Sequence, residues 1–208
     1  MGRWLALELA STIRHDGDGG VADDLATVAG AARWLHGCAD LLSGDLPEGG
    51  VVADEALREE IVGVRRAVRA LFARAVAPGP PSPADSARPM PFDEALDRLN
   101  TAAARAAVTP RLEWPEEGAP AVRVLPAQES PASRLVAALA RDAIGFLAGP
   151  QRELLRACTA PRCVRYFVKS HGRQEWCKVS CGNRARAARH YRRHRTEAQD
   201  GPDGPAPS

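Results

Sequence analysis

The chain has 208 residues, of which 45% are hydrophobic and only 5% aromatic, and its formal net charge is +2. No apolar run approaches the roughly 20 residues of a transmembrane helix, so we expect no membrane partner. The length suits one medium-sized domain, or one domain with a small appendage. The N-terminal segment predicts an amphipathic helix and not a signal peptide, because Glu8 interrupts its short apolar stretch. We therefore expect a cytoplasmic protein whose thiols stay reduced.

The net charge conceals a strong asymmetry along the chain. Residues 1–151 carry 15 basic and 21 acidic side chains, a net charge of −6, whereas residues 152–195 carry 13 basic and two acidic ones, a net charge of +11. So basic a segment is typical of proteins that bind nucleic acid. The alternative is a solvated basic tail without a partner.

Apolar residues at helical spacing predict four helices in the first 108 residues. The expected helices cover residues 4–14, a segment from the N-cap Thr27 to residue 42, residues 54–77 and residues 92–108. Loops rich in glycine and proline are expected between them, at residues 15–20, 43–50 and 78–91. This alternation is typical of a mostly helical domain.

After this helical part, the residue pattern changes from helical spacing to short runs. Two short runs, residues 111–114 and 121–125, predict a β-hairpin. A further helix is expected to have Ser130 as its N-cap and Pro131 as its first residue, and to end at Gly149. The final residues, 196–208, are rich in proline and glycine and predict a disordered tail.

Four of the five cysteines gather near the C-terminal end, as Cys158-x4-Cys163 and, thirteen residues later, Cys177-x3-Cys181. Two close pairs at this spacing are typical of a zinc site, and four thiolates complete a tetrahedral shell, so the zinc would be structural. Such a site can supply on the order of 10 kcal/mol of folding free energy. Free or disulfide-linked cysteines and a two-iron, two-sulfur centre are the alternatives.

Other residues of this region have simpler interpretations. The segment between the cysteine pairs predicts a second β-hairpin, with residues 165–168 as its first strand and residues 175–176 in its return. The fifth cysteine, Cys38, lies beside apolar residues and is expected to be a small buried side chain. His190 and His194 have the i,i+4 spacing of metal ligands, but four available thiolates favour positions that face solvent or phosphate.

A basic helix with Cys181 in its first turn is expected to continue through residue 195. At about 100° per residue, Ala185, Ala188 and Tyr191 lie on the side of the metal. The opposite side and its flank carry what we call the basic stripe, which consists of Arg186, Arg189, His190 and Arg193. Arginine binds phosphates and guanine edges through two parallel hydrogen bonds, so the stripe predicts a nucleic-acid contact.

The segment WCKVSCGNRARAARHYRRHR, with CTAPRC upstream, resembles the CGNR zinc finger, a treble-clef module. The motif letters are Cys181, Gly182, Asn183 and Arg184, and Trp176 before the third cysteine also fits. The N-terminal segments LALEL, DDLATVAGAARWL and RRAVRALF are similar to the ABATE domain that usually precedes this finger. Together the resemblance covers nearly the whole chain up to residue 195.

The resemblance implies an α+β fold: a mostly helical N-terminal domain with a small β-hairpin, residues 1–150, followed by a C-terminal treble-clef zinc finger, residues 151–195. It also implies a bacterial transcription regulator with a role in stress. Structural roles near the zinc are expected for Trp176, Gly182, Asn183 and Arg184. The chain departs from the family in two places, because Ser11 replaces a usual asparagine and the dipeptide at residues 174–175 replaces an arginine-rich edge.

The sequence leaves three classes of function to consider. The first is a DNA-binding regulator whose N-terminal domain senses a small-molecule effector or forms a homodimer. The second is an RNA-binding or ribosome-associated zinc module, which would expose aromatic side chains for base stacking. The finger offers Tyr166, Phe167, Trp176 and Tyr191, and most of them are expected in the core, which favours DNA. The third is an enzyme, which we do not expect: the chain has no P-loop or GxGxxG motif, and His15 is expected at a helix end.

Overall fold

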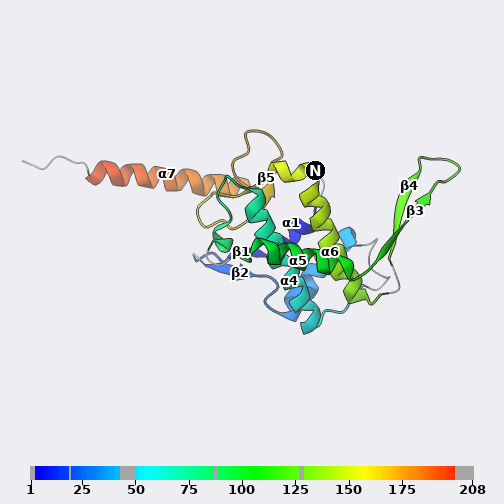
Figure 1. Cartoon of the computed structure of the whole chain (residues 1–208). Helices are drawn as coiled ribbons and strands as arrows, with labels where there is room; N and C mark the ends of the chain where they lie inside the picture. The colour runs from blue at the N-terminus through cyan, green and yellow to red at the C-terminus, as the bar shows by residue number, and fades with distance from the viewer. Residues whose placement is uncertain (1–2, 19, 43–49, 87–88, 127–128, 200–208) are drawn as a thin grey trace, which may run out of the picture.

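The structure of the protein is a computed structural model that describes residues 3–18, 20–42, 50–86, 89–126 and 129–199. Its fold class is α+β, as predicted (Figure 1). The α-helices are α1 (Leu5–Ala10), α2 (Val28–Gly37), α3 (Ala39–Leu42), α4 (Glu55–Ala75), α5 (Phe92–Ala104), α6 (Pro131–Ala148) and α7 (Val179–Gln199). Two 3-10 helices are η1 (Pro83–Asp85) and η2 (Pro150–Leu154).

The strands form three antiparallel pairs, each a separate two-stranded sheet. The pairs are β1 (Ile13–His15) with β2 (Val21–Asp23), β3 (Val108–Glu113) with β4 (Ala121–Pro126), and β5 (Leu155–Ala157) with β6 (Tyr166–Val168). None of the helices that the structure describes is long and apolar enough to cross a membrane.

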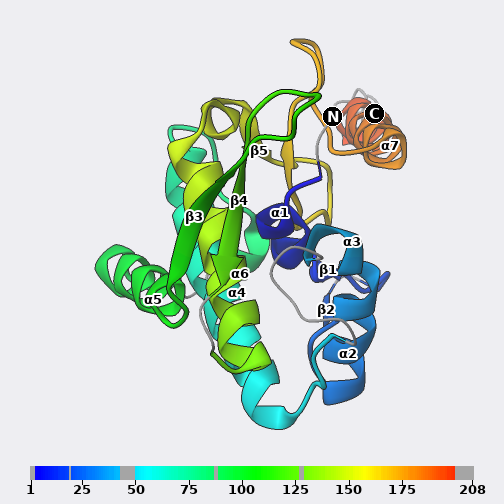
Figure 2. The ribbon, with the colours of Figure 1, turned by 90° about the vertical axis from the view of Figure 1, so that its right-hand side faces the viewer.

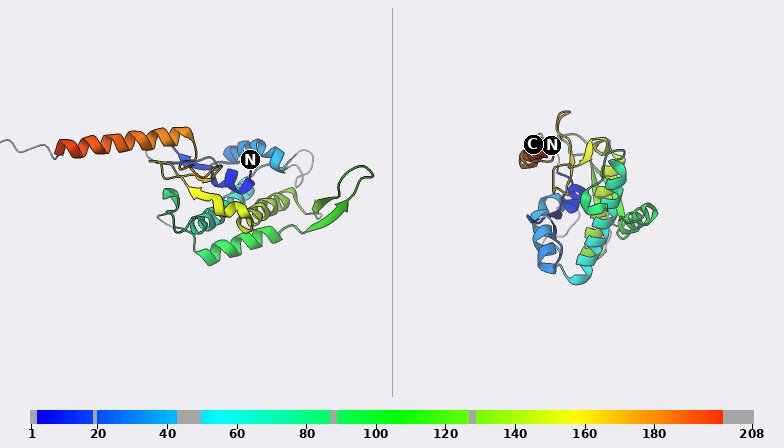
Figure 3. Two further views of the ribbon diagram at one scale, coloured as in Figure 1. Left: turned by 90° about the horizontal axis from the view of Figure 1, so that it is seen from above. Right: turned by 90° about the vertical axis from the view of Figure 1, so that its left-hand side faces the viewer.

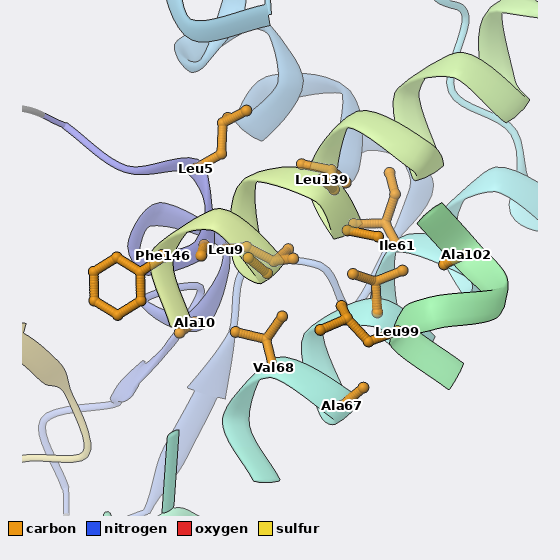
Figure 4. Close-up of a cluster of buried hydrophobic side chains, with 14 of the residues drawn as sticks. Leu5, Leu9, Ala10, Ile61, Ala67, Val68, Leu99, Ala102, Leu139 and Phe146 are labelled. Atoms are coloured by element: carbon orange, nitrogen blue, oxygen red, sulfur yellow. The ribbon is translucent and has the colours of Figure 1, made fainter. Parts of the chain in front are cut away.

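The core forms around α4, which packs against α1, α5 and α6. Asp54 is the N-cap of this helix: its side chain accepts a hydrogen bond of 2.8 Å from the backbone N–H of Leu57 and so satisfies a free donor of the first turn. Its apolar stripe, with Ile61 and Val68, meets Leu99 of α5 and Phe146 of α6 (Figure 4). Figure 2 shows α4 and α6 side by side, with α5 on one side of them and α2 on the other.

Capping residues begin α2 and α6 as predicted, but the helix expected to reach residue 42 is interrupted at Cys38, the C-cap of α2. Thr27 accepts a hydrogen bond of 3.1 Å from the N–H of Gly30 at the start of α2. Ser130 does the same for the N–H of Ser133, also at 3.1 Å, and Pro131 is the first residue of α6. The predicted stop at Gly149 is also confirmed.

The expectation of one helix over residues 4–14 is wrong, because α1 ends at Ala10 and the chain turns into strand β1. The hydroxyl of Thr12 donates a hydrogen bond of 2.7 Å to the carbonyl of Leu9, so a side chain competes with the helical backbone pattern at this point. Strand β1 then pairs with β2 across the glycine-rich segment. His15 is therefore a strand residue and not the end of a helix.

The β3–β4 hairpin is confirmed, and it projects from the helical body on the side away from α7 (Figures 1 and 3). Leu112 lies opposite Val122, so the two share a face of the hairpin, and Arg111 lies opposite Arg123 on the other face. Leu112, Val122 and the neighbouring Trp114 expose between 64% and 68% of their surfaces. The hairpin thus presents apolar side chains to solvent.

Two expectations for the C-terminal region are wrong. Strand β6 pairs with the upstream β5 and not with residues 175–176. The pairing extends beyond the strands, because the N–H of Cys158 donates to the carbonyl of Arg165 at 2.9 Å. Helix α7 also continues to Gln199, so residues 196–199 are helical and do not belong to a disordered tail. The rest of the expected tail, residues 200–208, lies outside the described residues.

Candidate metal centre and basic helix

The four clustered cysteines converge on one point. One sulfur from each of Cys158, Cys163, Cys177 and Cys181 lies within 4.8 Å of the other three. The Sγ of Cys177 is 3.7 Å from that of Cys163 and 3.5 Å from that of Cys181. A tetrahedral zinc ion with Zn–S bonds of about 2.3 Å needs sulfurs about 3.8 Å apart. The cluster therefore fits one zinc ion.

Local structure brings the two pairs together. Cys158 follows strand β5, and a tight turn leads to Cys163, whose N–H donates to the carbonyl of Ala160 at 3.0 Å. Arg162 adopts the left-handed conformation, with φ of 63°, in this turn. The second pair straddles the start of α7, where the N–H of Cys181 donates to the carbonyl of Lys178 at 3.0 Å. A β-hairpin end and a helix start thus face each other across the cluster.

Crowding makes the thiols unequal. Hydrogen bonds with Cys158 and Cys177 lower the pKa of Cys163, whereas hydrogen bonds with Cys158 and Cys163 raise the pKa of Cys177. None of the five cysteines forms a disulfide. Four thiolates this close need a divalent cation to neutralise them, and an all-sulfur set with a closed shell suits zinc in a structural role. When bound, zinc would link the hairpin end to the helix.

The residues beside the cysteines contact the cluster or its surroundings. The guanidinium of Arg184 donates a hydrogen bond of 3.2 Å to the Sγ of Cys181. A Cβ at Gly182 would lie 3.0 Å from a ring carbon of Trp176, so glycine allows the indole to approach the helix. The amide oxygen of Asn183 accepts a hydrogen bond of 2.6 Å from Arg186.

Helix α7 runs outward from the finger, away from the helical body (Figures 1 and 3). All four residues of the basic stripe line one shallow surface along it, together with Ala187 and Arg192. The guanidiniums of Arg186 and Arg189 lie 5.9 and 5.6 Å from the ring centre of Trp176. The Nε2 atoms of His190 and His194 are 3.1 Å apart. Glu197 is the one acidic residue in the sequence of this helix.

The expectation that Tyr191 packs towards the metal is wrong, because this side chain is 75% exposed. Ala185 is buried against the cysteine cluster, and Ala188 is half-buried. One turn further on, α7 has left the finger and has no surface to pack on (Figure 1). Tyr191 therefore belongs to the exposed surface of the basic helix.

A buried polar network attaches the finger to α4. Arg69 binds the carboxylate of Asp85 through two hydrogen bonds of 2.8 and 2.9 Å. The same guanidinium donates to the hydroxyl of Ser82 at 3.0 Å and to the carbonyl of Val164 at 3.2 Å. The hydroxyl of Tyr166 in β6 donates to Asp85 at 2.7 Å. Burial and the carboxylate of Asp85 raise the pKa of Tyr166, so the phenol stays protonated as a donor.

The sequence alone does not predict this network. A signal was present, because Arg65 and Arg69 lie four residues apart on the apolar face of α4, where only 4% of each is exposed. A buried arginine requires hydrogen-bonding partners. The partners come from segments far away in the chain, including α1, β2, η1 and the finger, so their identity could not be predicted. Cys38 is buried as expected, and burial raises the pKa of its thiol to about 11.

Together, the helical body, the four-cysteine cluster and the outward basic helix define the class of the protein: a zinc-finger protein with an appended α+β domain. Comparison with family models gives the family. The ABATE model, described as "Putative stress-induced transcription regulator", matches residues 4–150, and the CGNR zinc finger model matches residues 155–194. The chain belongs to the ABATE family and carries a CGNR zinc finger.

None of the curated proteins compared with the chain matches it. The two family matches support a regulatory role that involves nucleic acid, and neither family is a family of enzymes. The matched residues include both cysteine pairs and the whole basic stripe.

Proposed function

We propose that the protein is a DNA-binding transcription regulator whose zinc finger presents the basic stripe to DNA. The observation that carries the proposal is the outward projection of α7 with the stripe along one side (Figure 1). A helix with its side chains is about 10–12 Å across, which matches the roughly 12 Å width of the major groove. From residue 186 to residue 193 the helix rises about 10 Å, the length of about three base pairs.

The zinc cluster and Trp176 support this helix at its base. Ala185 packs on the cluster, and the indole lies beside the first two arginines of the stripe. Zinc binding would therefore fix the direction in which α7 leaves the finger. The stripe residues would supply affinity through phosphates and selectivity through guanine edges.

An RNA partner is the alternative, and one observation favours it. The ring of Tyr191 is exposed on the basic helix, where it could stack on an unpaired base. Base stacking on an aromatic side chain contributes about 1–3 kcal/mol. A Tyr191→Ala variant should therefore weaken the binding of single-stranded or looped RNA about 5- to 150-fold. It should leave duplex DNA binding nearly unchanged if the groove contact is made by the arginines.

The test uses full-length protein with its zinc content verified. Arg186→Ala, Arg189→Ala and Arg193→Ala are titrated against duplex DNA, single-stranded DNA and structured RNA at two salt concentrations, with Arg33→Ala on the exposed side of α2 as the control. Each lost phosphate contact should flatten the slope of log K against log salt by about 0.9 on duplex DNA. If the stripe variants bind all three nucleic acids as tightly as the parent, the basic stripe of α7 does not contact nucleic acid. If only RNA binds, the alternative holds.

We also infer that the protein forms a homodimer through the β3–β4 hairpin. An isolated two-stranded hairpin is only marginally stable in water, and neither strand packs extensively on another described helix or strand. In a dimer, the apolar side chains of Leu112, Trp114 and Val122 would pack against the same hairpin face of another copy. Sedimentation should show a dimer that Leu112→Ser disrupts, whereas Arg123→Ser on the opposite face should not. A monomeric parent protein at high concentration contradicts the inference.

A further inference from the structure

A cleft opens on the N-terminal domain between α4, α5, α6 and the short helix η2. Its volume is about 550 Å³, within the range of pockets that bind small molecules. Leu71 and Leu99 line it with buried side chains, and Leu147 contributes from α6. Phe92 and Leu96 also line it, and each leaves 41% of its surface exposed. The cleft therefore keeps apolar surface in contact with solvent.

The charge of this cleft is one-sided. Arg74 and Arg152 line it, and no acidic residue does. The guanidinium of Arg74 lies 4.1 Å from the ring centre of Phe92, which holds it against the wall. Asn100 is the one uncharged polar side chain of the lining. The cleft is therefore electropositive, because no carboxylate of its lining neutralises the two guanidinium groups.

We propose that this cleft binds an amphipathic anion, namely a carboxylate with a hydrophobic body. The carboxylate would be bound by Arg74 and Arg152, which match its geometry through paired N–H donors. The hydrophobic body would cover the leucines and Phe92, where each buried methylene contributes about 0.8 kcal/mol. A sugar or a nucleotide fits poorly, because its many polar groups would meet mainly apolar side chains.

The position of Arg152 connects the cleft with the zinc finger. Helix η2 runs directly into β5, whose first residue, Leu155, is fully buried in the core. Lys169 at the end of β6 donates its N–H to the carbonyl of Leu154 at 2.9 Å. The zinc ligand Cys158 directly follows β5. An anion bound by Arg152 would therefore hold the segment from which the finger extends. This coupling rests on the proposed function, whereas the binding does not.

The test measures binding of decanoate to zinc-loaded, full-length protein by titration calorimetry. Decanol, decyltrimethylammonium and acetate serve as probes that lack the charge, reverse it or lack the hydrophobic body. Decanoate should bind at least tenfold more tightly than any of them. Arg74→Gln and Arg152→Gln should each weaken decanoate binding about tenfold, and Arg66→Gln, on the same helix as Arg74 but outside the cleft, should not.

Circular dichroism of each variant verifies that the fold is retained. The proposal is overturned if decanoate does not bind, if decanol binds equally well, or if both cleft variants bind decanoate as the parent does. Leu147→Gln provides a second probe, because it places a polar group in the apolar lining and should also weaken binding. The effect of decanoate on the affinity for duplex DNA is measured separately. A cleft that binds decanoate in a protein that does not bind DNA would retain this proposal and reject the proposed function.

Discussion

One arginine side chain in the first turns of α7 contacts the cysteine cluster. Arg184 is the residue whose guanidinium contacts a thiol directly, at 3.2 Å from the Sγ of Cys181. A charge-assisted hydrogen bond of this kind stabilises the thiolate and orients it towards the metal. The sequence places five further arginines in the rest of α7, so position, and not charge alone, distinguishes this one.

We predict that Arg184→Ala lowers zinc affinity about 10- to 100-fold, as expected when a partner of a metal ligand is removed. Competition with a chromophoric chelator measures the affinity. Arg195→Ala, at the exposed far end of the same helix, is the matched control and should leave it unchanged. Equal zinc retention by the two variants would show that the contact with Cys181 is unimportant.

A second residue-scale prediction concerns Asp23, which binds the buried Arg65 through a hydrogen bond of 2.7 Å to Nη2 and a second contact to Nη1. Burial acts to raise the pKa of Asp23, but the hydrogen bonds from Arg65 and from the N–H of Leu25 outweigh it and lower the pKa below its ordinary 3.8. The ionised carboxylate is therefore fully stabilising above its unfolded-state pKa. This contribution is lost as the pH falls through the lower, folded-state pKa.

The free energy of unfolding should accordingly decrease as the pH falls below about 4, and Asp23→Asn should flatten this part of the profile. At pH 7 the substitution should cost about 3 kcal/mol, because it leaves a buried guanidinium without its counter-ion. The neighbouring Asp24 forms an exposed ion pair with Arg14, so Asp24→Asn should cost less than about 1 kcal/mol. Urea unfolding across pH measures both. Similar losses of unfolding free energy in Asp23→Asn and Asp24→Asn would contradict the expected difference between the buried and the exposed ion pair.

Among the elements, the contact between strand β6 and helix α4 decides how the finger is attached. Tyr166 packs its ring against Phe72, with 5.5 Å between ring centres, and its hydroxyl reaches Asp85. Leu155 and Ala157 of β5 belong to the same buried cluster as α4 and α6. The first hairpin of the finger is thus part of the core of the body, whereas α7 extends away from it (Figure 1).

We predict that Tyr166→Phe costs about 1–2 kcal/mol, because the ring packing remains while the buried carboxylate of Asp85 loses a donor. Hydrogen exchange should show the loss as faster exchange in β5 and β6. Tyr191→Phe, which removes the same hydroxyl from an exposed position, should have no measurable effect. Unchanged protection of β5 and β6 in the Tyr166 variant would mean that the hydroxyl does not hold the finger to α4.

At the scale of the whole molecule, two adjoining parts of the chain are stabilised differently: the helical body by burial of apolar side chains, and the cysteine turns by metal binding. The body has a continuous apolar core, whereas the buried cluster around the cysteines is small and contains few apolar side chains. A module of this size needs a metal to fold. That residues 1–150 form an independent domain stays a prediction, because β5 and β6 contribute to the core of the body.

Removal of zinc by a chelator should therefore unfold the cysteine turns and the start of α7 but leave α1, α4, α5 and α6 folded. Hydrogen exchange followed by mass spectrometry should lose protection in residues 158–163 and 177–185 and retain it in α4 and α6. Re-addition of zinc should restore the exchange pattern of the zinc-loaded protein. Cys177→Ser should reproduce the exchange pattern of the chelator-treated protein. Simultaneous melting of α4 would show that the body depends on the finger for its stability.

Local patterns in the sequence determined much of this protein. The capping residues Thr27 and Ser130, the apolar stripe of α4 and the spacing of the four cysteines each depend on residues close in the chain. Helix periodicity and paired metal ligands are local signals. For this reason the long helices, the zinc centre and the basic helix could be predicted.

Tertiary structure decided the features that depend on distant partners. The strands β1, β5 and β6 have three residues each, too few to show an alternating pattern, so their pairing could not be predicted. The partners of Arg69 come from residues 10, 82–85 and 164, and the cleft arises where α4, α5, α6 and η2 meet. The exposure of Tyr191 depends on where the finger ends beneath α7. Each of these features results from packing between segments far apart in the chain, which no local pattern of residues encodes.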